Sequence, residues 1–297
     1  HIPAAPPGLL PLNQRPDLIH AHGYKEVVVG LLLARRWKTP LILTQHGFVD
    51  NSRKTRLYNR LDMFCCRLKG VSRVLCASAE ILSRYRAAMV APAKLVLEPN
   101  AVPLRPLSSG KKSSAADSRI ILYAGRLSKE KGVDVLLEAA ALLGGRPFRL
   151  DIAGDGPLGP SLERRIRELG LTNKVFLLGF REDMSSLLGQ ADIFVLPSLS
   201  EGSPLALQEA MAEGLCCVAG AVGEIPSLLA DGAGLLVPPG DPEALAEVLV
   251  GLLSAPGAEL ERMGTKARRV LRERGSLEAR ASVVRHVYEQ ALGERQC

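Results

Sequence analysis

Short apolar runs that alternate with amphipathic helical stretches place the strongest limit on how this chain folds. This alternation is typical of parallel strands that are joined by helices lying on the faces of the sheet. In the first part of the chain, the pattern predicts strands at 17–21, 40–45, 73–77 and 94–98, and helices at 24–37, 53–69 and 79–89.

A second unit of the same kind follows a polar segment. Its predicted strands lie at 119–124, 148–153, 175–178, 193–196, 216–219 and 234–237. Its predicted helices lie at 133–143, 161–169, 204–212, 242–253 and 258–273, and a last helix follows at 276–292. Asp241 before Pro242 is a typical helix start. We therefore predict an α/β fold with two Rossmann-like, doubly wound domains.

The small and polar residues of 105–117 indicate an interdomain linker. We accordingly predict a first domain at 1–106, a linker at 107–118 and a second domain at 119–273. The helix at 276–295 is expected to pack back on the first domain. That first domain looks incomplete, because only four strands are predicted there and no glycine-rich strand–turn–helix opens it. We interpret His1 as a fragment boundary or a processing point.

Composition and charge exclude several classes of protein. Aromatic residues make up only 4% of the chain, which argues against a nucleic-acid partner, and no apolar run has the length of a membrane-spanning helix. Residues 1–117 hold 18 Lys and Arg against 7 Asp and Glu, so the first half is strongly basic. The six cysteines form no CxxC pair and read as buried, reduced core residues, which predicts a cytoplasmic protein.

The segment from Gly154 to Gly159 formally matches a dinucleotide-binding fingerprint. Pro157 removes a backbone N–H from the turn that would bind a pyrophosphate. The following strand, 175–178, also ends without a carboxylate for a ribose. We interpret this segment as a tight turn between a strand and a helix.

Two loops that follow predicted strands carry the candidate chemistry. Arg126 and Lys131 come after the strand at 119–124, where open α/β sheets bind ligands, and two cations there suit a diphosphate. The alternative is an ordinary solvated loop. The segment from Glu201 to Glu209 enters the helix at 204–212, so the N–H groups of Ser203 and Leu205 are expected to face the ligand. The alternative makes Glu201 a helix cap and Glu209 a surface ion-pair partner.

On these residues the chain resembles retaining GT-B glycosyltransferases of the group 1, or family 4, type. The matching segments are Gly125–Gly132, Gly154–Pro157, 222–226, 234–241 and the E-x7-E pair Glu201/Glu209 with Gly202, Ser203, Pro204 and Leu205 between them. The resemblance implies two domains facing a cleft and transfer of a sugar from a nucleoside-diphosphate donor to a hydroxyl acceptor. It further suggests synthesis of cell-envelope glycolipids or polysaccharides.

The resemblance also implies roles for individual residues. Arg126 and Lys131 would stabilise the departing diphosphate, Glu209 would hold the ribose and Glu201 the donor sugar. The nucleobase is expected near Phe180 and Arg181. Since no carboxylate is placed as a covalent nucleophile, we expect a front-face substitution. No motif requires a metal or a cofactor, and the nucleotide sugar enters as substrate.

In the first half, 16–22 and 40–47 look like strands of the family's acceptor domain. His46 would then face the donor sugar, and the simpler alternative is a strand-end histidine satisfied by backbone. We expect His20 and His22 to point to different sides of their strand. Zinc binding by His46 with one of them is disfavoured, because no cysteine or carboxylate completes the ligand set.

The segment 53–69 predicts a basic amphipathic helix with Leu57, Leu61, Phe64 and Leu68 on one face. Either this face is buried in its own domain, or it adsorbs to an anionic membrane and brings the enzyme to a lipid-linked acceptor at the inner face. Two further functions stay open, a sugar-nucleotide epimerase of the same fold and a non-catalytic nucleotide-sugar-binding protein.

Overall fold

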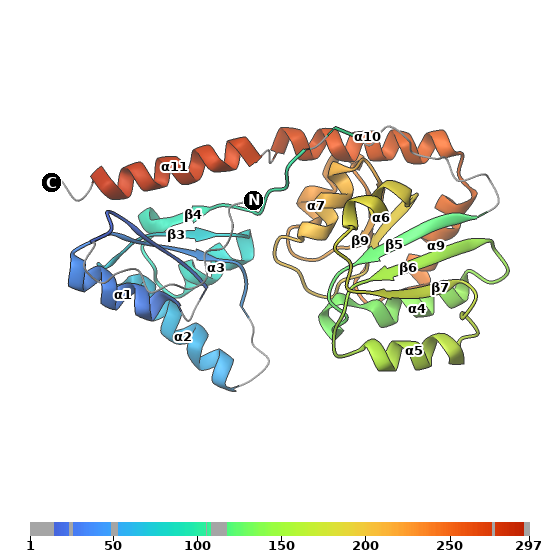
Figure 1. The fold of residues 1–297 in the computed structure, drawn as a ribbon, viewed down its shortest axis with the longest axis horizontal. Coiled ribbons are helices and arrows are strands. Elements are labelled where there is room, and N and C mark those ends of the chain that lie inside the picture. Colours follow the sequence, from blue (N-terminus) through green and yellow to red (C-terminus); the bar gives the residue numbers. More distant parts are fainter. Residues whose placement is uncertain are drawn as a thin grey trace. The chain divides into compact units, whose positions relative to one another are not determined.

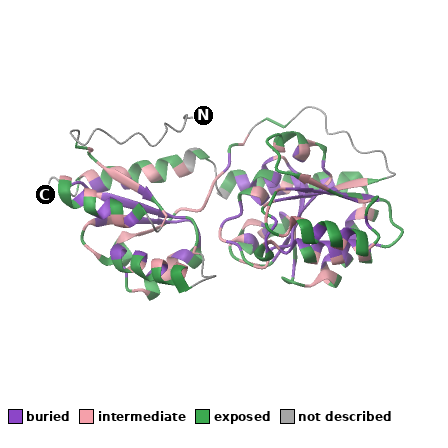
Figure 2. Ribbon diagram, turned by 60° about the horizontal axis from the view of Figure 1, so that its bottom comes forward, coloured by how far each residue is buried: buried purple, intermediate pink, exposed green. Residues whose placement is uncertain are grey.

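The computed structural model describes residues 15–23, 26–48, 53–104, 106–107, 118–274 and 277–293. The chain divides into two compact units, residues 1–98 with 281–297 and residues 99–280. Each unit has its own parallel sheet with helices packed against it, so the predicted α/β class is confirmed (Figure 1). In Figure 2 the buried residues concentrate in the strands and on the helix faces turned toward them.

The first unit has a four-stranded parallel sheet in the order β1-β2-β3-β4. Its strands are β1 (Ile19–His22), β2 (Leu41–Gln45), β3 (Val71–Cys76) and β4 (Leu95–Leu97). Its helices are α1 (Glu26–Trp37), α2 (Arg53–Arg67), α3 (Ala79–Ala87), the short η1 (Pro92–Lys94) and most of α11 (Leu277–Gly293). All four predicted strands are present, with ends that differ by one or two residues.

Strand β2 is buried on both faces, which explains the three consecutive apolar residues with which it begins. Leu41 and Leu43 point into the core formed with the helices that follow β1, β2 and β3. Ile42 points the other way and packs against Val287 and Ala291 of α11. The C-terminal helix therefore closes the second face of this sheet.

The second unit has a six-stranded parallel sheet in the order β10-β9-β8-β5-β6-β7. The strands are β5 (Arg119–Ala124), β6 (Phe148–Ala153), β7 (Val175–Gly179), β8 (Ile193–Leu196), β9 (Cys216–Gly220) and β10 (Leu235–Val237). The chain proceeds from β5 to one side and then returns to β8 on the other side. The carboxyl ends of β5 and β8 thus flank a topological switch point, where α/β sheets bind ligands.

The helices of the second unit cover both faces of this sheet. They are α4 (Val133–Leu142), α5 (Gly159–Glu168), α6 (Met184–Gln190), α7 (Leu205–Ala212), α8 (Ile225–Leu228), α9 (Pro242–Ser254) and α10 (Gly257–Arg274), with the short η2 (Lys129–Lys131) and η3 (Ala230–Gly232). The sequence did not predict α6 or α8. Both are too short to show a helical period, and Ser185, Ser186 and Gly189 lower the helix propensity of α6.

The division of the chain falls after Glu98, and residues from 281 on join the first unit. The predicted boundary lay at 106, and 108–117 of the predicted linker lie outside the described residues. Cys65, Cys66, Cys76, Cys216 and Cys217 are buried free thiols, whereas Cys297 lies outside the described part. Among the described helices, none has the length and apolar content needed to cross a membrane.

Candidate functional site

The loop after β5 is held close to the neighbouring turn after β6. The N–H of Leu127 donates to the carbonyl of Asp155 at 2.9 Å, and the Tyr123 hydroxyl donates to the carbonyl of Arg126 at 3.0 Å. These bonds fix the loop backbone on both sides of Arg126. The Arg126 side chain itself is exposed at the carboxyl edge of the sheet.

An ion pair joins this loop to the loop after β8. The ammonium of Lys131 lies 2.6 Å from Oε1 of Glu201, and the hydroxyl of Ser198 donates to the same oxygen at 2.7 Å. The Glu201 carboxylate is buried, with 7% of its side chain exposed, whereas Lys131 retains 25%. A second bond, from the N–H of Leu199 to the carbonyl of Glu130 at 2.8 Å, holds the same two loops together.

Two glycines, one after β5 and one after β9, permit close backbone contacts with the loop after β8. Gly132 has φ +62°, and a Cβ there would lie 2.2 Å from the carbonyl oxygen of Pro197. Gly223 has φ +55°, and its Cβ would lie 2.0 Å from the carbonyl oxygen of Glu201. Any larger residue would force the backbone of the Glu201 loop away.

The entry to α7 is fixed by polar contacts on both sides. The Asn100 side chain donates to the Ser203 carbonyl at 2.9 Å, and the Gln208 amide donates to the Ser203 hydroxyl at 3.1 Å. The N–H of Glu224 donates to the carbonyl of Gly202 at 3.2 Å. Helix α7 begins after Pro204 with no side-chain cap. Its positive end is therefore available to an external anion.

A cavity of about 430 Å³ lies at the carboxyl edge of the sheet, lined by residues from the loops after β5, β6 and β7 and from α7. Four residues predicted as site residues line it: Arg126, Arg181, Leu205 and Glu209. The other lining residues are Ala124, Gly125, Ala153, Gly154, Asp155, Phe180, Met184 and Ala206. Lys131 and Glu201 do not line this cavity and instead pair with each other.

Phe180, near which the nucleobase is expected, is 75% exposed and lines this cavity. The structure adds Asp155 and Met184 to the wall, and neither was expected as a site residue. Met184 begins the unpredicted helix α6, so no periodicity could have found it. Ser198 had a signal, since a hydroxyl three residues before Glu201 lies in an otherwise apolar strand end.

The Arg181 guanidinium is engaged by its own loop. It donates to both carboxylate oxygens of Asp183, at 2.8 and 2.7 Å. These bonds raise the pKa of Arg181 and lower the pKa of Asp183. Both side chains are partly exposed, so the pair adds little to stability. Arg181 lines the cavity as predicted, and its contact with a donor stays a prediction.

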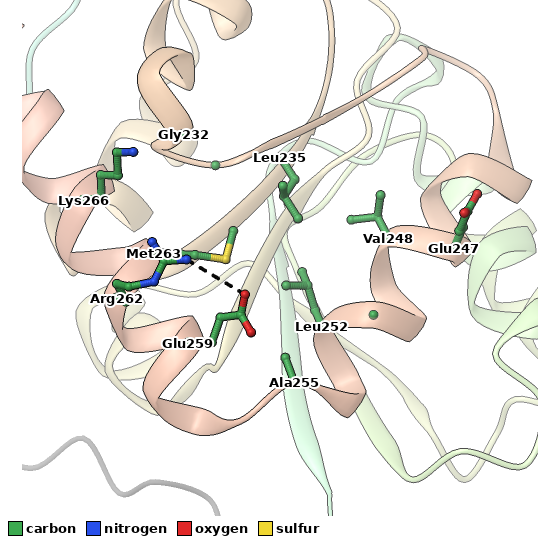
Figure 3. A pocket seen from close by; sticks show the side chains of 12 residues that line it. Gly232, Leu235, Glu247, Val248, Leu252, Ala255, Glu259, Arg262, Met263 and Lys266 are labelled. Carbon is green, nitrogen blue, oxygen red and sulfur yellow. Dashed lines mark ion pairs between the residues drawn. The ribbon is translucent and has the colours of Figure 1, made fainter.

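A second cavity of the same unit, of about 650 Å³, lies between β10, α9 and α10 (Figure 3). Its walls carry Met263 and Leu252 beside Arg262 and Glu259, whose charged groups lie 3.9 Å apart. None of the residues predicted as site residues lines it. It thus stands apart from the chemistry at the carboxyl edge.

In the first unit, His46 follows β2 and lies in a stack of three imidazole rings. His22 Nδ1 lies 3.3 Å from His46 Nε2, and the rings of His20 and His22 have centroids 4.3 Å apart. The prediction that His20 and His22 point to different sides is wrong. Residues two apart on a strand share a face, because the side-chain period of a strand is two.

Hydrogen bonds hold the base of this stack. His20 Nδ1 lies 2.6 Å from the hydroxyl of Tyr288 on α11, and its Nε2 lies 2.7 Å from the hydroxyl of Thr44. Burial, followed by the charges of His22 and His46, lowers the pKa of His20 to about 4. Burial and then His22 also lower the pKa of His46. Among the described residues, no group of three His, Cys, Asp or Glu is arranged to hold a metal.

A buried carboxyl group supports the end of β2 just before His46. Asp62 of α2 is fully buried and accepts hydrogen bonds from the Tyr85 hydroxyl and, at 3.5 Å, from the Gln45 amide. Its second oxygen, Oδ1, has no hydrogen-bond partner. Burial raises the pKa of Asp62 from 3.8 to about 6, although both hydrogen bonds act against this rise.

Comparison with known proteins places the chain in a family. A model described as "Glycosyl transferases group 1" matches residues 105–270, and one described as "Glycosyltransferase Family 4" matches residues 2–105. The chain belongs to the group 1 family of glycosyl transferases.

Two curated relatives illustrate the similarity. The chain is 31% identical over 279 residues to the D-inositol 3-phosphate glycosyltransferase of Mycolicibacterium vanbaalenii, covering 83% of this chain and 61% of the relative. It is 35% identical over 179 residues to the alpha-D-kanosaminyltransferase of Streptomyces kanamyceticus, covering 59% of this chain and 46% of the relative. The matched part is therefore less than two thirds of either relative.

Solved structures confirm the predicted GT-B fold. The Anabaena protein Alr3699/HepE, solved in complex with UDP and glucose, has a TM-score of 0.82 at 22% identity, covering 92% of this chain and 77% of that chain. Sucrose-phosphate synthase from Thermosynechococcus elongatus has a TM-score of 0.80 at 23% identity, covering 94% and 74%.

The raised pKa of Asp62 generates a prediction about pH. Because its pKa is about 6 in the folded chain and 3.8 in the unfolded one, the stability that it contributes is present below pH 3.8 and is lost as the pH rises through 6. Asp62→Asn does not titrate. Relative to the parent, its free energy of unfolding should therefore increase by about 3 kcal/mol between pH 3.8 and pH 7.

Urea unfolding at several pH values measures this difference. Asp17→Asn, which removes an exposed carboxylate from the same unit, is the control for the loss of one carboxylate. His20 contributes in the opposite direction, since its stability is present above pH 6.5 and is lost as the pH falls through 4. The contribution of His20 cancels when Asp62→Asn is compared with the parent, because both proteins contain this histidine. If the difference in the free energy of unfolding between Asp62→Asn and the parent did not change with pH, the raised pKa of Asp62 would be contradicted.

Proposed function

We propose that this chain transfers a sugar from a nucleoside-diphosphate donor to a hydroxyl acceptor, with retention at the anomeric carbon. The observation that carries the proposal is the cavity at the switch point of the second sheet, where Arg126, the start of α7 and Glu209 meet. Membership of the glycosyl transferase group supports it. The Anabaena neighbour with the same fold was solved with UDP and glucose.

The diphosphate would lie between Arg126 and the amino end of α7. Arg126 offers a planar fork of donors, and the uncapped first turn of α7 offers N–H groups together with the positive helix end. Lys131 donates one of its three ammonium protons to Glu201, which leaves two to donate to a phosphate oxygen. These donors are fixed before the reaction, so they stabilise charge as it develops on the leaving diphosphate.

The two glutamates would hold the donor's hydroxyl groups. Glu209 lines the cavity and is assigned the ribose. The Lys131 and Ser198 bonds both reach Oε1 of Glu201, which orients Oε2 as an acceptor for the donor sugar. Phe180 offers an exposed ring against which the nucleobase can stack, with Arg181 beside it.

In the chemical step, the acceptor oxygen forms a bond to the anomeric carbon on the face from which the phosphate oxygen leaves. The acceptor's proton passes to that departing oxygen, so charge and atoms balance. The family resemblance assigns His46 to polarising the donor sugar, and this stays a prediction. No step of this reaction needs a cofactor beyond the nucleotide sugar.

Substitution of Glu209 in the cavity and of Lys131 outside its lining tests the donor site. Glu209→Ala and Lys131→Ala should each weaken binding of the matching nucleoside diphosphate at least tenfold, because each removes a charge-assisted hydrogen bond of about 1.5–3 kcal/mol. Isothermal calorimetry with UDP, GDP and ADP measures these affinities and shows which nucleobase the site prefers. Glu163→Ala, an exposed carboxylate of α5 outside the cavity, is the matched control. Unchanged affinity in both site variants would refute the site.

Turnover separates the proposal from its two alternatives. With a nucleotide sugar and a hydroxyl acceptor, we expect a glycoside whose anomeric proton coupling, measured by NMR, matches that of the donor. Free sugar or an epimer without glycoside would favour an epimerase. Saturable donor binding without any product would favour a binding protein.

His46→Gln should lower kcat and leave nucleotide affinity unchanged.

We further propose that α2 adsorbs to an anionic membrane. Leu57, Leu61 and Phe64 are 65%, 42% and 56% exposed, so the alternative that this face is buried in its own domain is wrong for them. Leu68, the fourth, packs partly against the core. The buried face carries Asn59, Asp62, Cys65 and Cys66 instead. The exposed leucines and phenylalanine, flanked by Arg and Lys, suit a lipid-linked acceptor.

Vesicle binding tests the membrane contact. The double variant Leu57→Gln/Phe64→Gln should bind vesicles of phosphatidylglycerol and phosphatidylcholine severalfold less than the parent, since each apolar side chain contributes about 1–2 kcal/mol on insertion. Co-sedimentation gives the bound fraction. The control Leu142→Gln changes a leucine of the second unit that is 52% exposed. An equal loss of vesicle binding in both variants, or no loss in either, would contradict the proposed membrane contact of α2.

A further inference from the structure

A cavity of about 400 Å³ lies in the first unit at the amino ends of β2 and β3. It sits at the opposite edge of this sheet from His46, which follows the carboxyl end of β2. Its polar lining comes from Arg35 and Lys38 at the end of α1, Thr39, Lys69 after α2, and Ser72 of β3. The site thus includes none of the residues assigned above to the donor, and it shares only Lys69 with the segment 53–69.

The charge of this cavity is one-sided. Three cations line it, and its lining includes no aspartate or glutamate. Within the described part of the chain, none of the three forms an ion pair. The guanidinium of Arg15 lies close by, donating to the carbonyl of Lys38 at 3.1 Å. Like charges gathered without a counter-charge repel each other, and a bound anion would relieve that repulsion.

The backbone departs from regular geometry to place two of these residues. Lys38 has φ +51°, the left-handed conformation that helices usually end with at a glycine. The N–H of Thr39 returns to the carbonyl of Ala34 at 3.0 Å, which makes Lys38 the left-handed residue after α1. A lysine here costs backbone strain that a glycine would avoid.

Ser72 occupies the second irregularity. Leu41 pairs with Val71 and Ile42 pairs with Arg73, so Ser72 is the extra residue of a register shift between β2 and β3. Such bulges redirect a side chain out of the regular alternation. Here the shift brings a hydroxyl to the same cavity as the three cations.

Helix-end stabilisation does not account for these cations. The carbonyls at the end of α2 already accept hydrogen bonds from Lys94, at 3.2 Å for Cys66 and 2.7 Å for Leu68. At the end of α1, the carbonyl of Ala34 accepts from the Thr39 N–H. Lys38 and Lys69 are therefore additional to the groups that cap the two helices.

We propose that this cavity binds a phosphate group, carried either by a small soluble phosphate ester or by a lipid headgroup. Arg35 offers a bidentate fork, Lys38 and Lys69 offer point charges, and Ser72 offers a hydroxyl donor. The volume exceeds that of one phosphate, leaving room for the small organic group that carries it.

The experiment measures binding of inorganic phosphate and glycerol phosphate by calorimetry, with ionic strength held constant by chloride. The double variant Arg35→Gln/Lys69→Gln should weaken binding at least tenfold. Arg164→Gln/Arg167→Gln on α5 removes the same charge from two exposed residues outside the cavity and away from α2, and it should keep the parent affinity. Lys38→Gly should also weaken binding while raising Tm, because glycine adopts the left-handed conformation without strain.

A second arm distinguishes the source of the phosphate. Vesicles of phosphatidylcholine with and without phosphatidic acid are compared for the same variants. Binding of vesicles but not of soluble phosphates, lost in Arg35→Gln/Lys69→Gln and kept in the control, assigns the site to a lipid headgroup. Equal weakening in both double variants overturns the proposal. Phosphate binding that survives in the cavity variants and disappears in Lys131→Ala overturns it as well, since the anion then occupies the donor site.

Discussion

The ion pair between Lys131 and Glu201 is the interaction on which the second unit's site depends. It joins the loops after β5 and β8 at the point where the strand order reverses. A buried carboxylate without a partner would cost several kcal/mol, and the contacts with Lys131 and Ser198 offset this cost for Glu201 at the sheet edge. These two loops can meet only because Gly132 lacks a side chain that would clash with Pro197. The cavity with Arg126 and Glu209 lies beside the anchored loops.

The first unit is organised around helix α2, which buries polar side chains in the core and exposes large apolar ones to solvent. Helix α2 turns Asp62 inward, where Tyr85 and Gln45 hold it, and leaves Leu57 and Phe64 in solvent. The same inward contact supports Gln45, the residue before His46. One helix thus links the end of β2 to the proposed membrane face. Helix α11 fixes the other side of the sheet and supplies Tyr288 to His20.

Much of the fold could be predicted because strands and helices leave a periodic trace in the sequence. The strands Arg119–Ala124, Phe148–Ala153 and Ile193–Leu196 have the predicted bounds, since each contains several buried apolar residues and is followed by a glycine or a proline. Helix α6 could not be predicted, because seven residues do not complete two turns. The hydrogen bond from Asn100 to the Ser203 carbonyl was also beyond prediction, because hydrogen bonds between distant segments leave no period in the sequence.

By itself, the sequence determined the order of the elements and the position of the candidate residues at the carboxyl ends of strands. It also determined the family, through Arg126, Lys131, Glu201 and Glu209. Only the tertiary structure decided which face of α2 is buried, because a core accepts Asp62 when Tyr85 and Gln45 bind it, and no helical period records those partners. It likewise decided that Lys131 pairs with Glu201, since that contact requires two loops seventy residues apart to meet at one sheet edge.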